Sequence, residues 1–223
     1  MNLLDFAGEV IFLSASGVLS PGPLFLVNLI CGTKQGYRAG IKIATGHAII
    51  ELPLIIILTI SFFQLVTITV NTYGLNILGL LGGISIITFS VIQITNTRQS
   101  IRRSLSNSSD HNVSAIANKP VFLGIVFTAL NPFFIAWWLT IGLKLIANST
   151  SLFGVTTGGF MIFSFHIWMD YAWLILTSYL IFKGVSIIDK RYYYFLLVSL
   201  NITLTVYGVY MLVSSVTNPT DMI

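Results

Sequence analysis

Charged side chains are scarce in this sequence: eleven Lys or Arg and seven Asp or Glu residues make up 8% of its 223 residues. A soluble domain normally carries about a quarter charged residues. The chain is also 55% hydrophobic, and several apolar runs exceed the ~18 residues that mark a membrane-spanning helix. The composition therefore predicts an integral membrane protein and argues against an unusually apolar soluble one.

Cysteine is nearly absent, because Cys31 stands alone. This excludes a disulfide within the chain, a CxxC or zinc pattern, and a transmembrane thiol–disulfide conductor. Basic residues are absent from the first twenty positions, which contain Asp5 and Glu9. A secretory signal needs a basic start, so we expect the first apolar run to be a retained helix. No motif indicates a cofactor.

Apolar stretches of helical length predict six transmembrane helices, at 5–31, 40–64, 74–95, 121–146, 152–182 and 194–216. The segment 96–120 is rich in Ser, Asn and Arg and has no apolar period, which is typical of a flexible linker. We expect an all-α fold with a single transmembrane domain over 1–223. It would consist of a first repeat (1–95), a cytoplasmic linker (96–120) and a second repeat (121–223).

Most Lys and Arg residues gather in alternate loops of this arrangement. Those of the odd-numbered loops are Lys34, Arg38, Lys42, Arg98, Arg102, Arg103, Lys119, Lys183, Lys190 and Arg191. Only Lys144 lies near a loop of the other parity. The positive-inside rule then places the odd-numbered loops in the cytoplasm and both termini outside the cell membrane. Because topology explains the net charge of +4, nucleic acid is not an expected partner. The sequon at Asn148, followed by Ser149 and Thr150, falls in a predicted exterior loop.

The two halves carry the same polar features in the same order. The first helix of one half contains Ser20-Pro21-Gly22-Pro23, and that of the other contains Asn131-Pro132. The second helix of each half then carries a histidine and an acid four residues apart, His47 with Glu51 and His166 with Asp170. Three helices per half make the halves cross the membrane in opposite directions, so we predict inverted repeats, as in many secondary transporters.

The prolines predict a break in the first helix of each half. Ser20 and Asn131 are suitable N-cap residues, and the proline after each suits the first position of a new helix. Gly22 adds backbone freedom, and Pro23 and Pro132 lie near the middle of their predicted spans. Each second half-helix would present free N–H groups and a positive dipole end, which suits a carboxylate or another anion. A plain proline kink without a ligand is the alternative.

The His–acid pairs are the candidate coupling residues. Residues four apart share one helix face, so His47 lies beside Glu51 and His166 beside Asp170. A carboxylate deep in a membrane is costly unless it is paired, protonated or hydrated. It can pair with a substrate ammonium group and exchange that partner for a proton. Two alternatives stay open: a structural pair that fixes helix packing, and a divalent metal site formed by all four residues if they converge.

The stretches Leu19–Pro23, Gly36–Gly40 and Gly46–Glu51 resemble the start of the LysE/RhtB amino-acid exporter family. Asn131-Pro132 and the aromatic run after it are similar to that family's second-half signature, and the resemblance covers most of the chain. The resemblance implies proton-driven export of amino acids or related metabolites, with Pro21, Gly22, Pro23 and Glu51 at functional positions. The chain departs from the family pattern at Phe133, where many members have lysine, and at Ile50, where glycine is frequent.

The sequence thus predicts a secondary transporter for export by proton antiport. The substrate would lie between the two halves, with its carboxylate at Ser20–Pro23 and Asn131–Pro132 and its ammonium at Glu51 and Asp170. The expected partners are a small-molecule substrate, protons and the bilayer, with a homodimer as an option. The alternatives are a divalent metal-ion exporter using the His–acid pairs as ligands, a passive channel, and an intramembrane enzyme; no enzyme activity is expected.

Overall fold

The described part of the chain is helical and contains no strand. The computed structural model describes residues 2–20, 22–68, 80–95, 118–184 and 190–217. Its helices are α1 (Leu3–Val18), α2 (Pro23–Gln35), α3 (Tyr37–Ile68), an unlabelled helix (Leu80–Thr95), α6 (Pro120–Ala129), α7 (Pro132–Trp137), the π-helical turn η1 (Trp138–Gly142), α8 (Leu143–Phe182) and α9 (Lys190–Thr217). The predicted linker lies almost wholly outside the described residues.

Each of the six predicted helical stretches contains helix. The first is α1 followed by α2, and the two are bent by 74° at the break between them. The fourth consists of α6, α7, η1 and the first part of α8, and the remainder of α8 is the fifth. The helices therefore follow the predicted order along the chain, with a break in the first helix of each half.

Two helical stretches are long and apolar enough to cross a membrane, Tyr37–Gln64 and Pro132–Phe182. A third span results if α1 and α2 are counted as one bent element. The helices Leu80–Thr95, Pro120–Ala129 and Asn201–Thr217 are apolar but shorter. The protein is thus membrane-embedded and helical, and its division into six spans with an inverted repeat stays a prediction.

The loop predicted between the fourth and fifth helices lies a few residues later in the chain than expected, and the side of the membrane that it faces stays a prediction. Asn148, Ser149 and Thr150 lie inside α8, and the chain turns instead at Gly154, whose φ of 77° is in the left-handed region that favours glycine. The Ser149 hydroxyl is buried and donates to the Gly158 carbonyl oxygen at 2.7 Å. This contact ties the two arms of the turn together, so the sequon is part of a packed helix.

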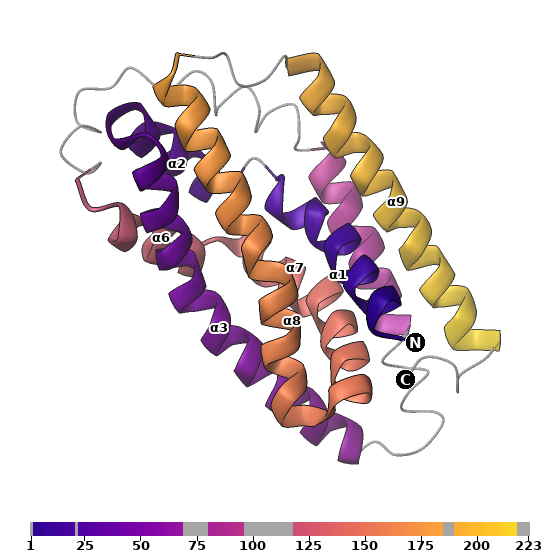
Figure 1. Ribbon diagram of the computed structural model, residues 1–223. Helices are drawn as coiled ribbons and strands as arrows, with labels where there is room; N and C mark the ends of the chain where they lie inside the picture. Colours follow the sequence, from indigo (N-terminus) through magenta and orange to yellow (C-terminus); the bar gives the residue numbers. More distant parts are fainter. Residues whose placement is uncertain (1, 21, 69–79, 96–117, 185–189, 218–223) are drawn as a thin grey trace.

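α3 and α8 run side by side along the molecule, and α1 and α9 lie on the other side of α8 (Figure 1). α3 also packs against α6, while α2 and α1 both pack against α8. An apolar core that includes Phe6, Ile55, Trp138 and Ile162 joins α1, α3, η1 and α8. Elements from the two halves of the sequence therefore contact each other throughout the described part.

Glycines permit the closest of these helix contacts. A Cβ added at Gly46 of α3 would lie 2.8 Å from the Ile125 backbone N and 2.9 Å from the Gly124 Cα, both on α6. Gly124 in turn has no room for a side chain against the backbone of Ile43. Small residues let membrane helices approach closely, and here they bring α3 and α6 into backbone contact beside His47.

Candidate functional site

Four ionisable side chains converge where α3 meets α8. α3 provides His47 and Glu51, and α8 provides His166 and Asp170. The spacing of four residues puts each pair on one helix face, and the two faces are turned toward each other. All four residues are buried, with 5%, 0%, 4% and 7% of their surfaces exposed in chain order. We call them the His–acid quartet.

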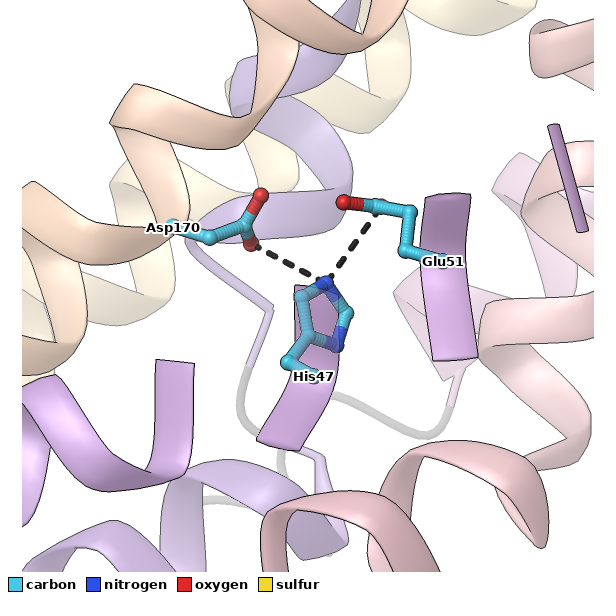
Figure 2. Close-up of side chains that lie close together, drawn as sticks. All are labelled: His47, Glu51 and Asp170. Carbon is cyan, nitrogen blue, oxygen red and sulfur yellow. Dashed lines mark ion pairs between the residues drawn. The ribbon is translucent and has the colours of Figure 1, made fainter. Parts of the chain in front are cut away.

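Each histidine of the quartet lies between both carboxylates. His47 Nε2 is 3.3 Å from Glu51 Oε1 and 3.7 Å from Asp170 Oδ1. His166 Nε2 is 3.1 Å from Glu51 Oε1 and 3.3 Å from Asp170 Oδ2. Figure 2 shows His47 pointing between Glu51 and Asp170, which extend toward each other from separate helices. The two pairs thus form one cluster, although His47 and His166 are 119 residues apart in the sequence.

The other ring nitrogen of each histidine is held by a hydroxyl group from the opposite half of the sequence. His47 Nδ1 is 2.9 Å from Thr128 Oγ1 on α6. His166 Nδ1 is 2.7 Å from Ser14 Oγ on α1. Such contacts on the far ring nitrogen fix the orientation of an imidazole and the position of its protons. Both histidines are therefore directed at the carboxylates by the helices that precede the two breaks.

Aromatic side chains surround the quartet. Trp138 of η1 donates its indole N–H to Glu51 Oε1 at 3.2 Å. The rings of Trp137 and Trp138 lie 5.2 and 5.3 Å from that of His166, and Phe134 lies 5.2 Å from His47. π-helical turns such as η1 are frequent at functional sites. This aromatic cover keeps the quartet in a medium of low polarity, where charge pairing is strong.

The quartet is close to a balance of charge. With both histidines protonated, two imidazolium groups face two carboxylates, and the cluster has no net charge. Within the described residues, Glu51 Oε2 is buried without a hydrogen-bond partner. A buried carboxylate oxygen in that condition is costly unless a cation, a proton or water reaches it. The arrangement is therefore chemically suited to hold protons and to accept one further positively charged group.

The second helix break is as predicted. Asn131 is the N-cap of α7, its side-chain oxygen accepts a hydrogen bond from the Phe133 backbone N–H at 3.1 Å, and Pro132 is the first helical residue. Pro132 fits this position because a proline has no N–H to satisfy there. α7 then continues through η1 into α8.

The first helix break corrects the expected role of Ser20. The N-cap of α2 is Gly22, without a side-chain cap, and Pro23 is the first helical residue. Ser20 lies two residues before Gly22, and its hydroxyl accepts a hydrogen bond from Gln93 Nε2 at 3.0 Å. Pro21, the remaining residue of this predicted site, lies outside the described residues.

The two breaks lie next to each other. A Cβ built on Gly22 would be 3.5 Å from Asn131 Nδ2. Gly17 is one residue before the end of α1, and a Cβ built on it would be 3.1 Å from Trp137 Nε1. The Trp137 indole N–H donates to Ser16 Oγ at 3.1 Å. The predicted proximity of the two half-helix starts therefore has a geometric basis in the described residues.

Sequence reasoning missed three residues whose side chains are within hydrogen-bond distance of the quartet: Ser14, Thr128 and Trp138. Ser14 and Thr128 are ordinary polar residues of apolar helices, and nothing in their spacing distinguishes them from others. Trp138 belongs to the aromatic run after Asn131-Pro132, and that run was the one available signal.

Three quartet residues also meet the minimum requirement for a metal site. Donor atoms of His47, Glu51 and Asp170 all lie within 4.8 Å of one another. One imidazole and two carboxylates are a donor set that divalent transition metals accept, at about 2.0–2.2 Å for zinc. The donors would have to move closer together to bind such an ion.

Comparison with known proteins returns one family. The sequence model described as LysE type translocator matches residues 15–215, which is most of the chain. No curated protein and no solved structure matches the chain significantly.

Proposed function

The chain belongs to the LysE type translocator family, and from this premise we propose that it exports amino acids or related small metabolites by proton antiport. Membership implies a membrane transporter for small molecules and not an enzyme. The proposal adds the substrate class, the direction and the coupling ion. One observation carries it: the convergence of His47, Glu51, His166 and Asp170 from both halves of the sequence.

The coupling follows from charge balance in the quartet. A substrate ammonium group that pairs with Glu51 or Asp170 adds one positive charge to a buried cluster that is neutral when both histidines are protonated. Excess charge in a medium of low polarity is costly. Release of a proton from one imidazole restores the balance. Substrate binding and protonation of an imidazole therefore oppose each other, because each adds one positive charge to the same buried cluster, and this is the requirement for an exchange of one for the other.

The substrate carboxylate would lie at the helix breaks. α2 begins at Gly22–Pro23 and α7 at Asn131–Pro132, and Gly22 lies close to the Asn131 side chain. The start of a helix offers backbone N–H groups and the positive end of the helix dipole. A small zwitterion would then have its ammonium at the quartet and its carboxylate at the breaks. Pro21 is retained in this site on the family resemblance alone.

Alternating access would come from movement of one repeat, 1–95, against the other, 121–223, around this site. In this scheme the loops rich in Lys and Arg face the cytoplasm and both termini lie outside the plasma membrane. A homodimer stays an option for its assembly.

The test of the proposed function is counterflow in proteoliposomes. Purified protein is reconstituted with a panel of unlabelled amino acids inside, and uptake of each labelled amino acid is followed with and without a pH gradient. We expect uptake of at least one amino acid above protein-free liposomes, and an increase when the gradient is imposed. Absence of uptake for the whole panel would contradict the proposal.

Asn131→Ala should weaken substrate binding more than it weakens folding. Loss of the N-cap costs about 1 kcal/mol of stability, while loss of the break's geometry removes the N–H groups offered to the substrate carboxylate. The matched control is Asn131→Ser, which keeps a capping oxygen and should retain most of the affinity. Two quantities are measured: the half-saturating substrate concentration in counterflow and the melting temperature. If both variants keep the wild-type half-saturating concentration, the break is a plain kink.

A divalent metal ion is the alternative cargo, favoured by the closeness of His47, Glu51 and Asp170. The same proteoliposomes distinguish it, with Zn²⁺ and Mn²⁺ replacing the amino acids and a metal-sensitive dye inside. Metal transport that is lost in Asp170→Asn, with no uptake of amino acids, would favour this reading over the proposed one.

A further inference from the structure

One half-buried carboxylate outside the quartet belongs to Glu9 and joins three helices. Glu9 is on α1, and both of its oxygens are used: Oε1 accepts from the Tyr207 hydroxyl of α9 at 2.8 Å, and Oε2 accepts from Asn148 Nδ2 of α8 at 2.6 Å. All three side chains are half-buried. Neither the family match nor the quartet accounts for this cluster.

The position of Glu9 relates it to the quartet. It lies five residues before Ser14 on α1, and Ser14 contacts His166 Nδ1 at 2.7 Å. Five residues of α-helix correspond to about 7.5 Å along the axis and about 140° around it, so Glu9 and Ser14 lie on different faces of α1. α1 begins at Leu3, so Glu9 lies between the quartet and the end of the molecule at which α1 begins and α9 ends (Figure 1).

A structural tie between helices does not require a carboxylate. A glutamine makes the same two hydrogen bonds once the Asn148 amide turns over, and it avoids the cost of burying a charge. Ionisable groups in membrane helices are costly and generally mark ion or proton pathways. Lys144 on α8 interacts electrostatically with Glu9.

We propose that Glu9 is a second proton-carrying residue, which exchanges protons between the quartet and the membrane face at which α1 begins. This inference rests on the proposed proton coupling. The Glu9 carboxylate takes a proton from water at that face and gives it to a neutral His166 imidazole, with Ser14 as the last hydroxyl of the path. The interval along α1 exceeds a hydrogen bond, so the transfer uses water or a movement of α1.

The groups that surround Glu9 set the conditions of the test. They are Lys144 on α8, Tyr207 and behind it Tyr210 on α9, and Asp5 one turn earlier on α1. Unlike Glu9, Asp5 is exposed, and its side chain caps the start of α1. Asp5 is therefore a reference carboxyl on the same helix.

The first experiment needs no substrate. A hydrophobic carbodiimide reacts with protonated carboxyl groups, and mass spectrometry then locates the adducts in the reconstituted wild-type protein. We expect Glu9 to react, because a residue that carries protons is protonated for part of the time. A Glu9 that stays unlabelled while Asp5 reacts would overturn the proposal.

The second experiment compares two variants in transport. Glu9→Gln removes the proton-carrying group, whereas Tyr207→Phe removes one hydrogen bond and keeps the carboxylate. The readout is the ratio of amino-acid uptake with a pH gradient to uptake without it. We expect Glu9→Gln to lose the stimulation and Tyr207→Phe to keep it; an equal loss in both would show a structural role. If the wild type transports no amino acid, the proposed function fails, and the carbodiimide experiment still decides the role of Glu9.

Discussion

Glu51→Gln is expected to abolish proton-driven export while the protein stays folded and inserted in the membrane. Glu51 Oε1 lies 3.3 Å from His47 Nε2 and 3.1 Å from His166 Nε2, and it accepts a hydrogen bond from Trp138. Glutamine keeps the shape of this side chain but not its charge. The cluster then has one carboxylate for two histidines, so it can no longer exchange an ammonium group for a proton. Full removal of one partner from a buried ion pair costs about 3–5 kcal/mol, and we expect the amide to limit the loss to about 2–3 kcal/mol.

The measurement is export from proteoliposomes driven by an imposed pH gradient, beside size-exclusion chromatography of the same preparation. Asp5→Asn is the matched control, because it removes one acid from an exposed position on α1 and should leave the rate unchanged. Wild-type export by a monodisperse Glu51→Gln protein would remove Glu51 from the coupling role.

Gly46→Ala is expected to prevent correct assembly of α3 with α6. A methyl group at this position would overlap the backbone of α6, including the Ile125 N at 2.8 Å and the Gly124 Cα at 2.9 Å. Backbone atoms cannot move aside as a flexible side chain does, so the helices must separate. Overpacking of a core costs about 1–3 kcal/mol, and separation would also take His47 away from Thr128. We therefore expect loss of both stability and transport.

A thermal shift assay on the purified protein is the direct measurement for this variant. A loss of about 2–3 kcal/mol corresponds to a decrease of about 5–10 °C in the melting temperature of a protein of this size. Gly8→Ala serves as the control, because a Cβ there meets nothing within 4 Å and alanine favours helix. Equal melting temperatures for wild type and Gly46→Ala would show that the contact between α3 and α6 is looser than described.

The sequence was sufficient to predict each His–acid pair, but not to predict that the two pairs lie together. Spacing alone predicts that His47 shares a face with Glu51, and His166 with Asp170, because one helical turn relates each pair. Convergence of the two pairs depends on how α3 and α8 pack across long sequence separations, and a single sequence contains no direct record of such contacts. The sequence therefore predicts the two pairs, and the packing of α3 against α8 brings them together.

The helix breaks show the same division between local and long-range information. Asn131 caps α7 as expected because capping is a local interaction. Ser20 does not cap α2, because that helix begins at Pro23 with Gly22 as its N-cap. The Ser20 hydroxyl instead accepts a hydrogen bond from Gln93, a partner 73 residues away. The turn between the fourth and fifth predicted helices was misplaced for a related reason: the polar residues Asn148 and Ser149 resemble a loop in sequence, but their contacts to Glu9 and Gly158 make them part of a packed helix.

Proton release on substrate binding tests most directly whether the quartet exchanges one positive charge for another. The amino acid with the strongest counterflow signal is added to the wild-type protein in a weakly buffered detergent solution. A pH indicator measures the change in the pH of that solution. The account predicts about one proton released for each substrate bound, since one added positive charge must be offset, and no release from Glu51→Gln. Substrate binding to the wild type without proton release would contradict it.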